Sequence, residues 1–182
     1  MDRRIKYDLD HCYFISDTHF GDKIMIRVFH RPFNNIDEMN NTIYNNIVNT
    51  VSKNDTLFFL GDGGSNLEPF ERLIVEKNIK LVWILGNHDD PDTINSLIGG
   101  YNGIKIYDNP IMVGGLWLSH EPIECILPEC PYLNIHGHTH LLNYGNGGKW
   151  LNGNRYFNVS VEAINYKPIS LNDIAKQIEY SL

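Results

Sequence analysis

Three short apolar runs, each followed by a polar residue, predict the first strands of the chain. The runs are rich in aromatic and branched residues and almost entirely apolar, as strands covered on both faces of a parallel sheet are. They are residues 12–16 (CYFIS), 56–61 (TLFFLG) and 81–86 (LVWILG). The residues that directly follow them are Asp17, Asp62 and Asn87.

Helical periodicity fills the stretch between the first two runs. Apolar residues recur every three or four positions over 36–51, and Asn35 with Glu38 resembles a capping box. Shorter helices are predicted at residues 68–78, 91–98 and 171–180. Alternating strands and helices predict parallel strands joined by crossovers, so the residues after the first three strands should meet at one edge of a sheet, where such sheets bind ligands.

The second half of the chain has strand-like segments without long helices between them. These segments are residues 109–122, 131–145 and 154–163, and glycine-rich turns separate them. The expected fold is therefore α/β, a four-layer α-β-β-α sandwich of two packed mixed sheets with outer helices. A length of 182 residues and a hydrophobic fraction of 42% suit a single domain spanning residues 1–182.

Charge and cysteine content narrow the classes of function. A net charge of −7 argues against a protein that binds long nucleic acids, whose affinity comes largely from neutralising phosphates. It leaves room for small phosphorylated substrates held by metal ions. Three cysteines without a CxxC spacing indicate reduced thiols and a cytoplasmic protein. No stretch approaches the roughly 20 apolar residues of a membrane span, and the oligomeric state is left open.

Five polar motifs follow the predicted strands and carry the candidate chemistry. They are SDTHFGD (16–22), LGDGG (60–64), LGNHDD (85–90), LSHEP (118–122) and HGHTH (136–140). Oxygen and imidazole ligands without thiolates suit Mn²⁺, Fe, Zn²⁺ or Ni²⁺. The ligand supply exceeds the need of one ion, and two divalent ions can clamp a phosphoryl group for in-line displacement. A two-histidine iron oxygenase site and a structural metal site both fit this ligand set poorly.

The ordered set D-x-H, GD, GNH, H and GHxH resembles the calcineurin-like metallophosphoesterase superfamily. The local match is to small single-domain bacterial and phage members that begin SDTHFGH and carry RPF, which here read SDTHFGD and HRPF. The resemblance implies ligands of a first ion (Asp17, His19, His140), a bridging ligand (Asp62) and ligands of a second ion (Asn87, His120, His138). His88 matches the catalytic histidine that is not a ligand.

Three further positions affect how the resemblance applies. Ser65 stands where many members have an acid that orients the catalytic histidine, and Asp22 replaces a histidine common in close relatives. Arg31, in HRPF, is expected near the mouth of the site, where it would hold a substrate phosphate by bidentate hydrogen bonds. The alternative for Arg31 is a solvated loop arginine.

The resemblance implies a dinuclear-metal-dependent phosphoesterase in which a metal-bound hydroxide attacks phosphorus in line. Mn²⁺ is the expected metal, and small phosphodiesters or nucleotides are the expected substrates, with phosphodiesterase favoured over phosphomonoesterase activity. The alternative is a catalytically silent metal-binding scaffold or interaction protein of the same fold.

Overall fold

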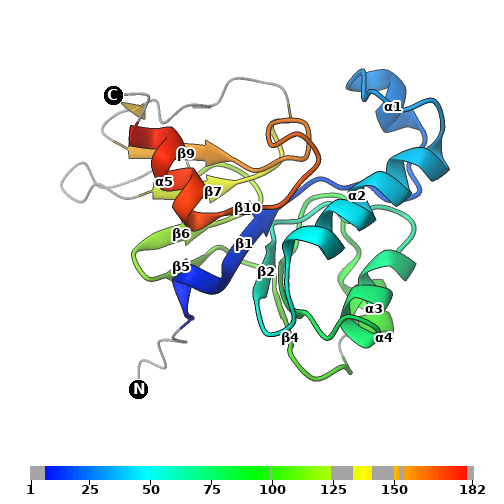
Figure 1. The fold of residues 1–182 in the computed structure, drawn as a ribbon, viewed down its shortest axis with the longest axis horizontal. Helices are drawn as coiled ribbons and strands as arrows, with labels where there is room; N and C mark the ends of the chain where they lie inside the picture. Colours follow the sequence, from blue (N-terminus) through cyan, green and yellow to red (C-terminus); the bar gives the residue numbers. More distant parts are fainter. Residues whose placement is uncertain (1–6, 99, 124–132, 141–149, 152–153, 180–182) are drawn as a thin grey trace.

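In the part of the chain that the structure describes, two five-stranded sheets form the centre (Figure 1). The structure is a computed structural model, and it describes residues 7–98, 100–123, 133–140, 150–151 and 154–179. The first sheet has the order β10 (Ile169–Ser170), β1 (Cys12–Ile15), β2 (Thr56–Phe59), β3 (Lys80–Ile84) and β4 (Ile104–Tyr107). Strands β1 to β4 pair in parallel and β10 runs antiparallel to β1. The three predicted strands therefore lie side by side at the centre of this sheet.

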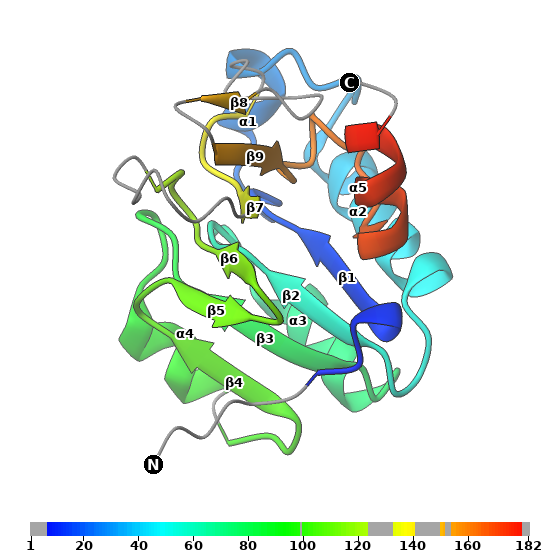
Figure 2. The ribbon, with the colours of Figure 1, turned by 90° about the vertical axis from the view of Figure 1, so that its left-hand side faces the viewer.

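The second sheet is also mixed, and it faces the first (Figure 2). Its order is β5 (Ile111–Val113), β6 (Leu116–Leu118), β7 (Leu133–His136), β9 (Asn154–Asn158) and β8 (Trp150–Leu151). Strands β6, β7 and β9 are parallel, whereas β5 and β8 are antiparallel to their neighbours. Two packed mixed sheets with helices outside them confirm the predicted fold class.

Helices α2 (Ile36–Thr50), α3 (Glu68–Val75) and α4 (Pro91–Ile98) cover the outer face of the first sheet (Figure 1). The core on this face includes Phe59, Phe70 and Trp83, all fully buried. A second core fills the space between the sheets, and α5 (Leu171–Glu179) contributes Ile174 and Ile178 to it. Helix α5 also lies next to β1 and β10.

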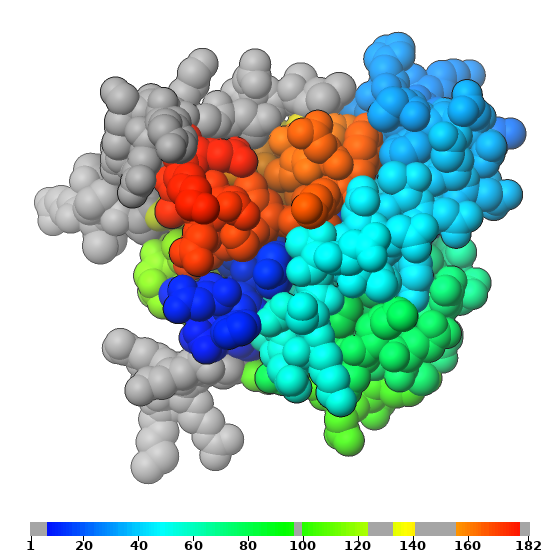
Figure 3. All heavy atoms as spheres, viewed as in Figure 1, coloured from blue at the N-terminus to red at the C-terminus, as the bar shows by residue number. Residues whose placement is uncertain are grey.

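Helices α2 to α5 begin where the sequence predicts, although α3 ends at Val75, three residues before the predicted end. The Asn35 side chain accepts a hydrogen bond of 2.9 Å from the Glu38 N–H, so the predicted cap of α2 is present. Two short segments were not predicted: a 3-10 helix at Leu9–His11, and α1 (Ile24–Val28), which has no side-chain cap and no buried residue. It projects from the body of the molecule in the space-filling view (Figure 3). Among the described residues, no helix is both long and apolar enough to cross a bilayer.

Candidate metal centre

The loops that follow β1, β2 and β7 present polar side chains from unusual backbone conformations. Left-handed φ angles occur at Asp17 (59°), His19 (48°), Asp62 (60°), His138 (65°) and His140 (46°). A residue other than glycine costs on the order of 1–3 kcal/mol in such a conformation and keeps it only where the surroundings enforce it. All five are predicted metal ligands, and they make up half of the ten non-glycine residues with left-handed φ in the described part of the chain.

Close approach of these loops explains two of the motif glycines. A Cβ atom on Gly137 would overlap the Ser16 hydroxyl, and a Cβ atom on Gly86 would overlap the Asp62 carboxylate. The loop after β7 packs against the loop after β1, and the loop after β3 packs against the loop after β2. Both close contacts require glycine, which has no Cβ atom.

One group of candidate ligands consists of Asp17, His19 and His140, whose ligand atoms lie within 4.8 Å of one another. The His140 Nε2 atom lies 3.6 Å from Asp17 Oδ1. The His19 Nε2 atom is buried without a hydrogen-bond partner and lies 3.7 Å from Asp62 Oδ2. Burial lowers the pKa of His19 against the opposing effect of nearby carboxylates, so its imidazole is neutral. A neutral, unpartnered nitrogen beside two carboxylates fits a divalent cation.

A second group gathers around Asn87. The Asn87 Oδ1 atom lies 2.9 Å from His120 Nε2 and 3.0 Å from His138 Nδ1. The Nδ1 atom of His120 faces the Leu60 carbonyl oxygen at 2.7 Å. An amide oxygen and two imidazole nitrogens thus point to one place, as ligands of a single ion would.

The Asp62 carboxylate lies between the two groups. Its Oδ2 atom is 3.7 Å from His19 Nε2 and 3.4 Å from His120 Nε2, while Oδ1 accepts a 2.9 Å hydrogen bond from the His88 N–H. Burial alone would raise the pKa of Asp62, but its interactions with His120, the His88 N–H and His19 together outweigh burial and lower the pKa to about 2. For His120, burial alone would lower the pKa, but the nearby carboxylates of Asp62 and Asp17 raise it to about 9. An ion at the second group would therefore displace a proton from His120.

The sequence match to known proteins decides the family. The family model described as calcineurin-like phosphoesterase matches residues 11–175, which include every predicted site residue. This chain belongs to the calcineurin-like phosphoesterase family. The family supports assignment as a metal-dependent phosphoesterase. Among the described residues, the ligand atoms of Asp17, His19 and His140, and also those of Asp17, Asp62 and His120, lie close enough together to hold a metal ion.

Two relatives are similar to this phosphoesterase over nearly their whole length. The uncharacterised protein MJ1445 of Methanocaldococcus jannaschii is 37% identical over 171 residues, which is 92% of this chain and 90% of the relative. A protein of unknown function, AQ665 from Aquifex aeolicus, has a crystal structure with a TM-score of 0.68 and 28% identity. That match covers 91% of this chain and 97% of the other.

His88 lies beside the metal-ligand groups of the phosphoesterase, with its side chain exposed. Its ring is in edge contact with the His19 ring at 5.7 Å between centroids, and within the described residues it has no hydrogen-bond partner. Ser65, at the position of the usual orienting acid, instead donates a 2.6 Å hydrogen bond to Asp22 Oδ1. Asp22 Oδ2 lies 3.2 Å from His19 Nδ1. The two departures from the family pattern are thus in contact, and the acid at position 22 holds a candidate ligand.

Arg31 does not lie where the sequence placed it. Its guanidinium is buried and donates four hydrogen bonds, to Glu162, the carbonyl oxygens of Asp17 and Thr18, and the Met39 sulfur, while Nη2 also lies 2.7 Å from Glu162 Oε1. Each guanidinium nitrogen thus already has a protein partner, and the substrate-binding role remains a prediction that this geometry does not favour.

Glu162 was missed by the sequence reasoning. It accepts from Arg31 and lies 3.0 Å from His140 Nδ1. Burial alone would raise the pKa of Glu162, but His140 and Arg31 outweigh it and lower the pKa. The available signal was an acid near the end of a segment that alternates apolar and polar residues, FNVSVEA.

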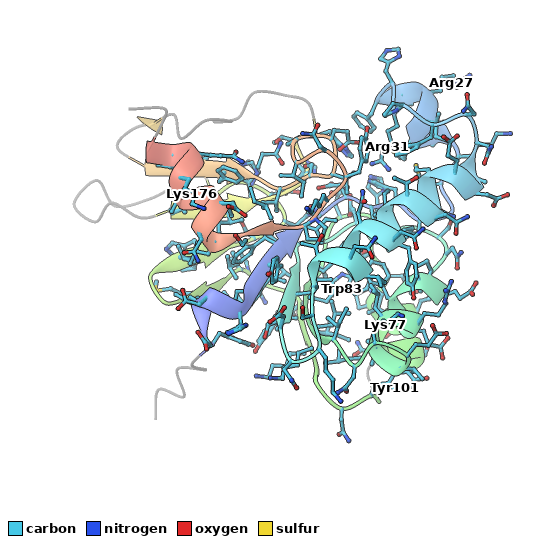
Figure 4. The ribbon with its side chains drawn as sticks, viewed as in Figure 1. Arg27, Arg31, Lys77, Trp83, Tyr101 and Lys176 are labelled. Atoms are coloured by element: carbon cyan, nitrogen blue, oxygen red, sulfur yellow. The ribbon has the colours of Figure 1, made fainter. Side chains whose placement is uncertain are left out.

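Asp89 joins the loop after β3 to the loop after β2. Its carboxylate accepts hydrogen bonds from the backbone N–H groups of Asp62 (3.0 Å), Gly63 (2.9 Å) and Gly86 (2.9 Å). A fourth comes from the indole of Trp83, which lies in the core under α3 (2.8 Å; Figure 4). This carboxylate therefore fixes the backbone on both sides of Asp62.

Replacing Asp89 with asparagine is expected to lower the free energy of unfolding by about 2–4 kcal/mol, because hydrogen bonds to a charged acceptor are lost from several donors at once. The matched control is Asp90→Asn, since Asp90 is exposed and bonds only within the start of α4 through Thr93. Its expected cost is about 1 kcal/mol, as for a helix cap. Denaturant unfolding of the three proteins measures the difference. Equal losses in the two variants would contradict the role given to Asp89.

Proposed function

We propose that this phosphoesterase hydrolyses small phosphodiesters or nucleotides with two divalent transition-metal ions, Mn²⁺ being the first choice. The observation that carries the two-ion proposal is Asp62, whose Oδ2 atom lies within 3.7 Å of a histidine from each group. A carboxylate shared by two sites lets two cations approach each other. Asp17, His19 and His140 would hold one ion, and Asn87, His120 and His138 the other.

The bound ions would supply Lewis-acid stabilisation of the phosphoryl oxygens and activate water for in-line attack. The protein itself contributes a candidate proton donor. His88 lines a cavity of about 310 Å³ and is tethered to Asp62 through its backbone N–H. The alkoxide that leaves a phosphodiester needs a proton, and an exposed imidazole beside the site can give one.

Acidic side chains in the two cavities that flank the centre support a preference for diesters. One cavity, of about 320 Å³, contains Asn87 and His120, and the other, of about 310 Å³, contains His88. Their acids are Asp108 and Glu121 in the first cavity, and Asp22, Asp89 and Asp90 in the second. Neither cavity has a lysine or arginine among the described residues that line it. A monoester dianion meets more repulsion there than a diester with one charge.

The test compares kcat/KM for bis-(p-nitrophenyl) phosphate and p-nitrophenyl phosphate with Mn²⁺. We expect the diester to be preferred by at least about tenfold, which corresponds to about 1.4 kcal/mol in the transition state. A preference for the monoester would overturn the diester proposal. A protein that binds Mn²⁺ and turns over neither ester would favour the silent scaffold.

A further inference from the structure

A buried ion pair lies behind the first group of candidate ligands. Arg31 Nη2 and Nε lie 2.7 and 2.8 Å from Glu162 Oε1, and the two side chains are 0% and 1% exposed. Arg31 comes from the segment between α1 and α2, and it reaches toward the loop that follows β9 (Figure 4). A buried ion pair often stabilises a fold no more than apolar residues of similar volume would. The contacts of this pair therefore indicate its role better than its contribution to stability does.

The acid of the pair contacts His140. Glu162 Oε1 lies 3.0 Å from His140 Nδ1, and His140 Nε2 lies 3.6 Å from Asp17 Oδ1. A carboxylate that accepts from Nδ1–H fixes the tautomer in which Nε2 has a free lone pair. Phe29 stacks on the same imidazole with 3.7 Å between ring centroids, so the ring plane is held as well.

Arg31, the other member of the pair, contacts the loop after β1. Arg31 donates hydrogen bonds of 2.8 Å to the Asp17 carbonyl oxygen and 2.9 Å to the Thr18 carbonyl oxygen. This is the loop in which Asp17 and His19 have left-handed backbone angles. One guanidinium therefore fixes the peptides on both sides of Thr18, and through Glu162 it is linked to His140, which follows β7.

We propose that Arg31 and Glu162 are positioning residues of the first metal site: they hold the Asp17–His19 loop and the His140 imidazole in one geometry. Neither side chain is a metal ligand or a substrate contact in this arrangement. The inference rests on the proposed function in so far as Asp17, His19 and His140 bind an ion. It predicts that the pair governs affinity for that ion and leaves the other ion unaffected.

The experiment places Glu162→Gln in two backgrounds. His120→Ala removes a ligand of the second group and leaves the first, whereas His140→Ala does the reverse. Mn²⁺ binding by titration calorimetry is expected to weaken by about 10- to 100-fold when Glu162→Gln is added to the first background. In the second background the same substitution is expected to change the Kd less than twofold. Arg31→Lys keeps the positive charge but loses the planar guanidinium that donates from several nitrogens at once. It should weaken Mn²⁺ binding at the same site.

Asp55→Asn is the matched control. Asp55 is also a buried acid that holds a histidine, His11, at 2.8 Å, but it lies at the amino end of β2, opposite the metal centre. The control should leave Mn²⁺ affinity unchanged even where it lowers Tm. Equal weakening in both backgrounds, or no weakening beyond that of Asp55→Asn, would overturn the inference.

The outcome is separable from that of the proposed function. A wild-type protein that binds Mn²⁺ but hydrolyses no phosphodiester would defeat the function and leave the binding cycle valid. An active enzyme in which Glu162→Gln and Arg31→Lys bind Mn²⁺ like the wild type would defeat the positioning role alone.

Discussion

Replacing His88 with alanine is expected to lower kcat by ~10²–10⁴-fold while the bound metal is retained. The imidazole is exposed and has no described contact with an acid, and the link to Asp62 is through the backbone N–H, which alanine keeps. Metal content and steady-state rates on a diester with a poor leaving group measure the two effects separately.

The control for this substitution is His11→Ala, which removes another exposed histidine, directly before the amino end of β1. It should leave both rate and metal content unchanged. If His88→Ala loses metal, His88 is a ligand and the motif assignment fails. If neither rate nor metal changes, the scaffold alternative gains.

Asparagine in place of Asp62 is expected to remove both ions together and to lower kcat/KM by at least ~10³-fold, because one carboxylate oxygen faces histidines of both groups. The side chain keeps its shape and can still accept from the His88 N–H, so the change is mainly one of charge. Elemental analysis after reconstitution with Mn²⁺ should show about two ions in the wild type and fewer than one in the variant.

The comparison for Asp62→Asn is Asp55→Asn, which makes the same chemical change at a buried acid away from the centre. Metal content near the wild-type value is expected there. A wild-type protein that holds at most one ion at saturating Mn²⁺, or an Asp62→Asn variant that keeps one ion at full affinity, would contradict the shared carboxylate.

Much of the fold was predictable because its central strands carry a local signal. Strands β1, β2 and β3 are buried on both faces, which makes their sequences continuously apolar, and α2 has its own cap at Asn35. Helix α1 and strand β10 have no such signal. The five residues of α1 bury nothing, and the two residues of β10 pair with β1 across most of the chain length.

The candidate site shows the same division. The motif residues were predictable because each follows a strand, and parallel strands bring their carboxyl ends together. The residues that hold the candidate ligands in place were not predictable. Arg31 and Glu162 are 131 positions apart and meet only in the folded chain. The contact between Asp22 and Ser65 likewise joins two segments whose separate departures from the family pattern looked unrelated.

The left-handed backbone angles at the five candidate ligands mean that selection for stability and selection for catalysis favour different residues at these positions. At each of these five positions, glycine would adopt the observed backbone angle without the steric cost of a side chain. A screen for heat resistance in metal-free medium would therefore tend to reward the loss of ligands, and it would enrich stable proteins without activity. Engineering of this chain for durability should leave these loops untouched and seek its gains in the helices that cover the first sheet.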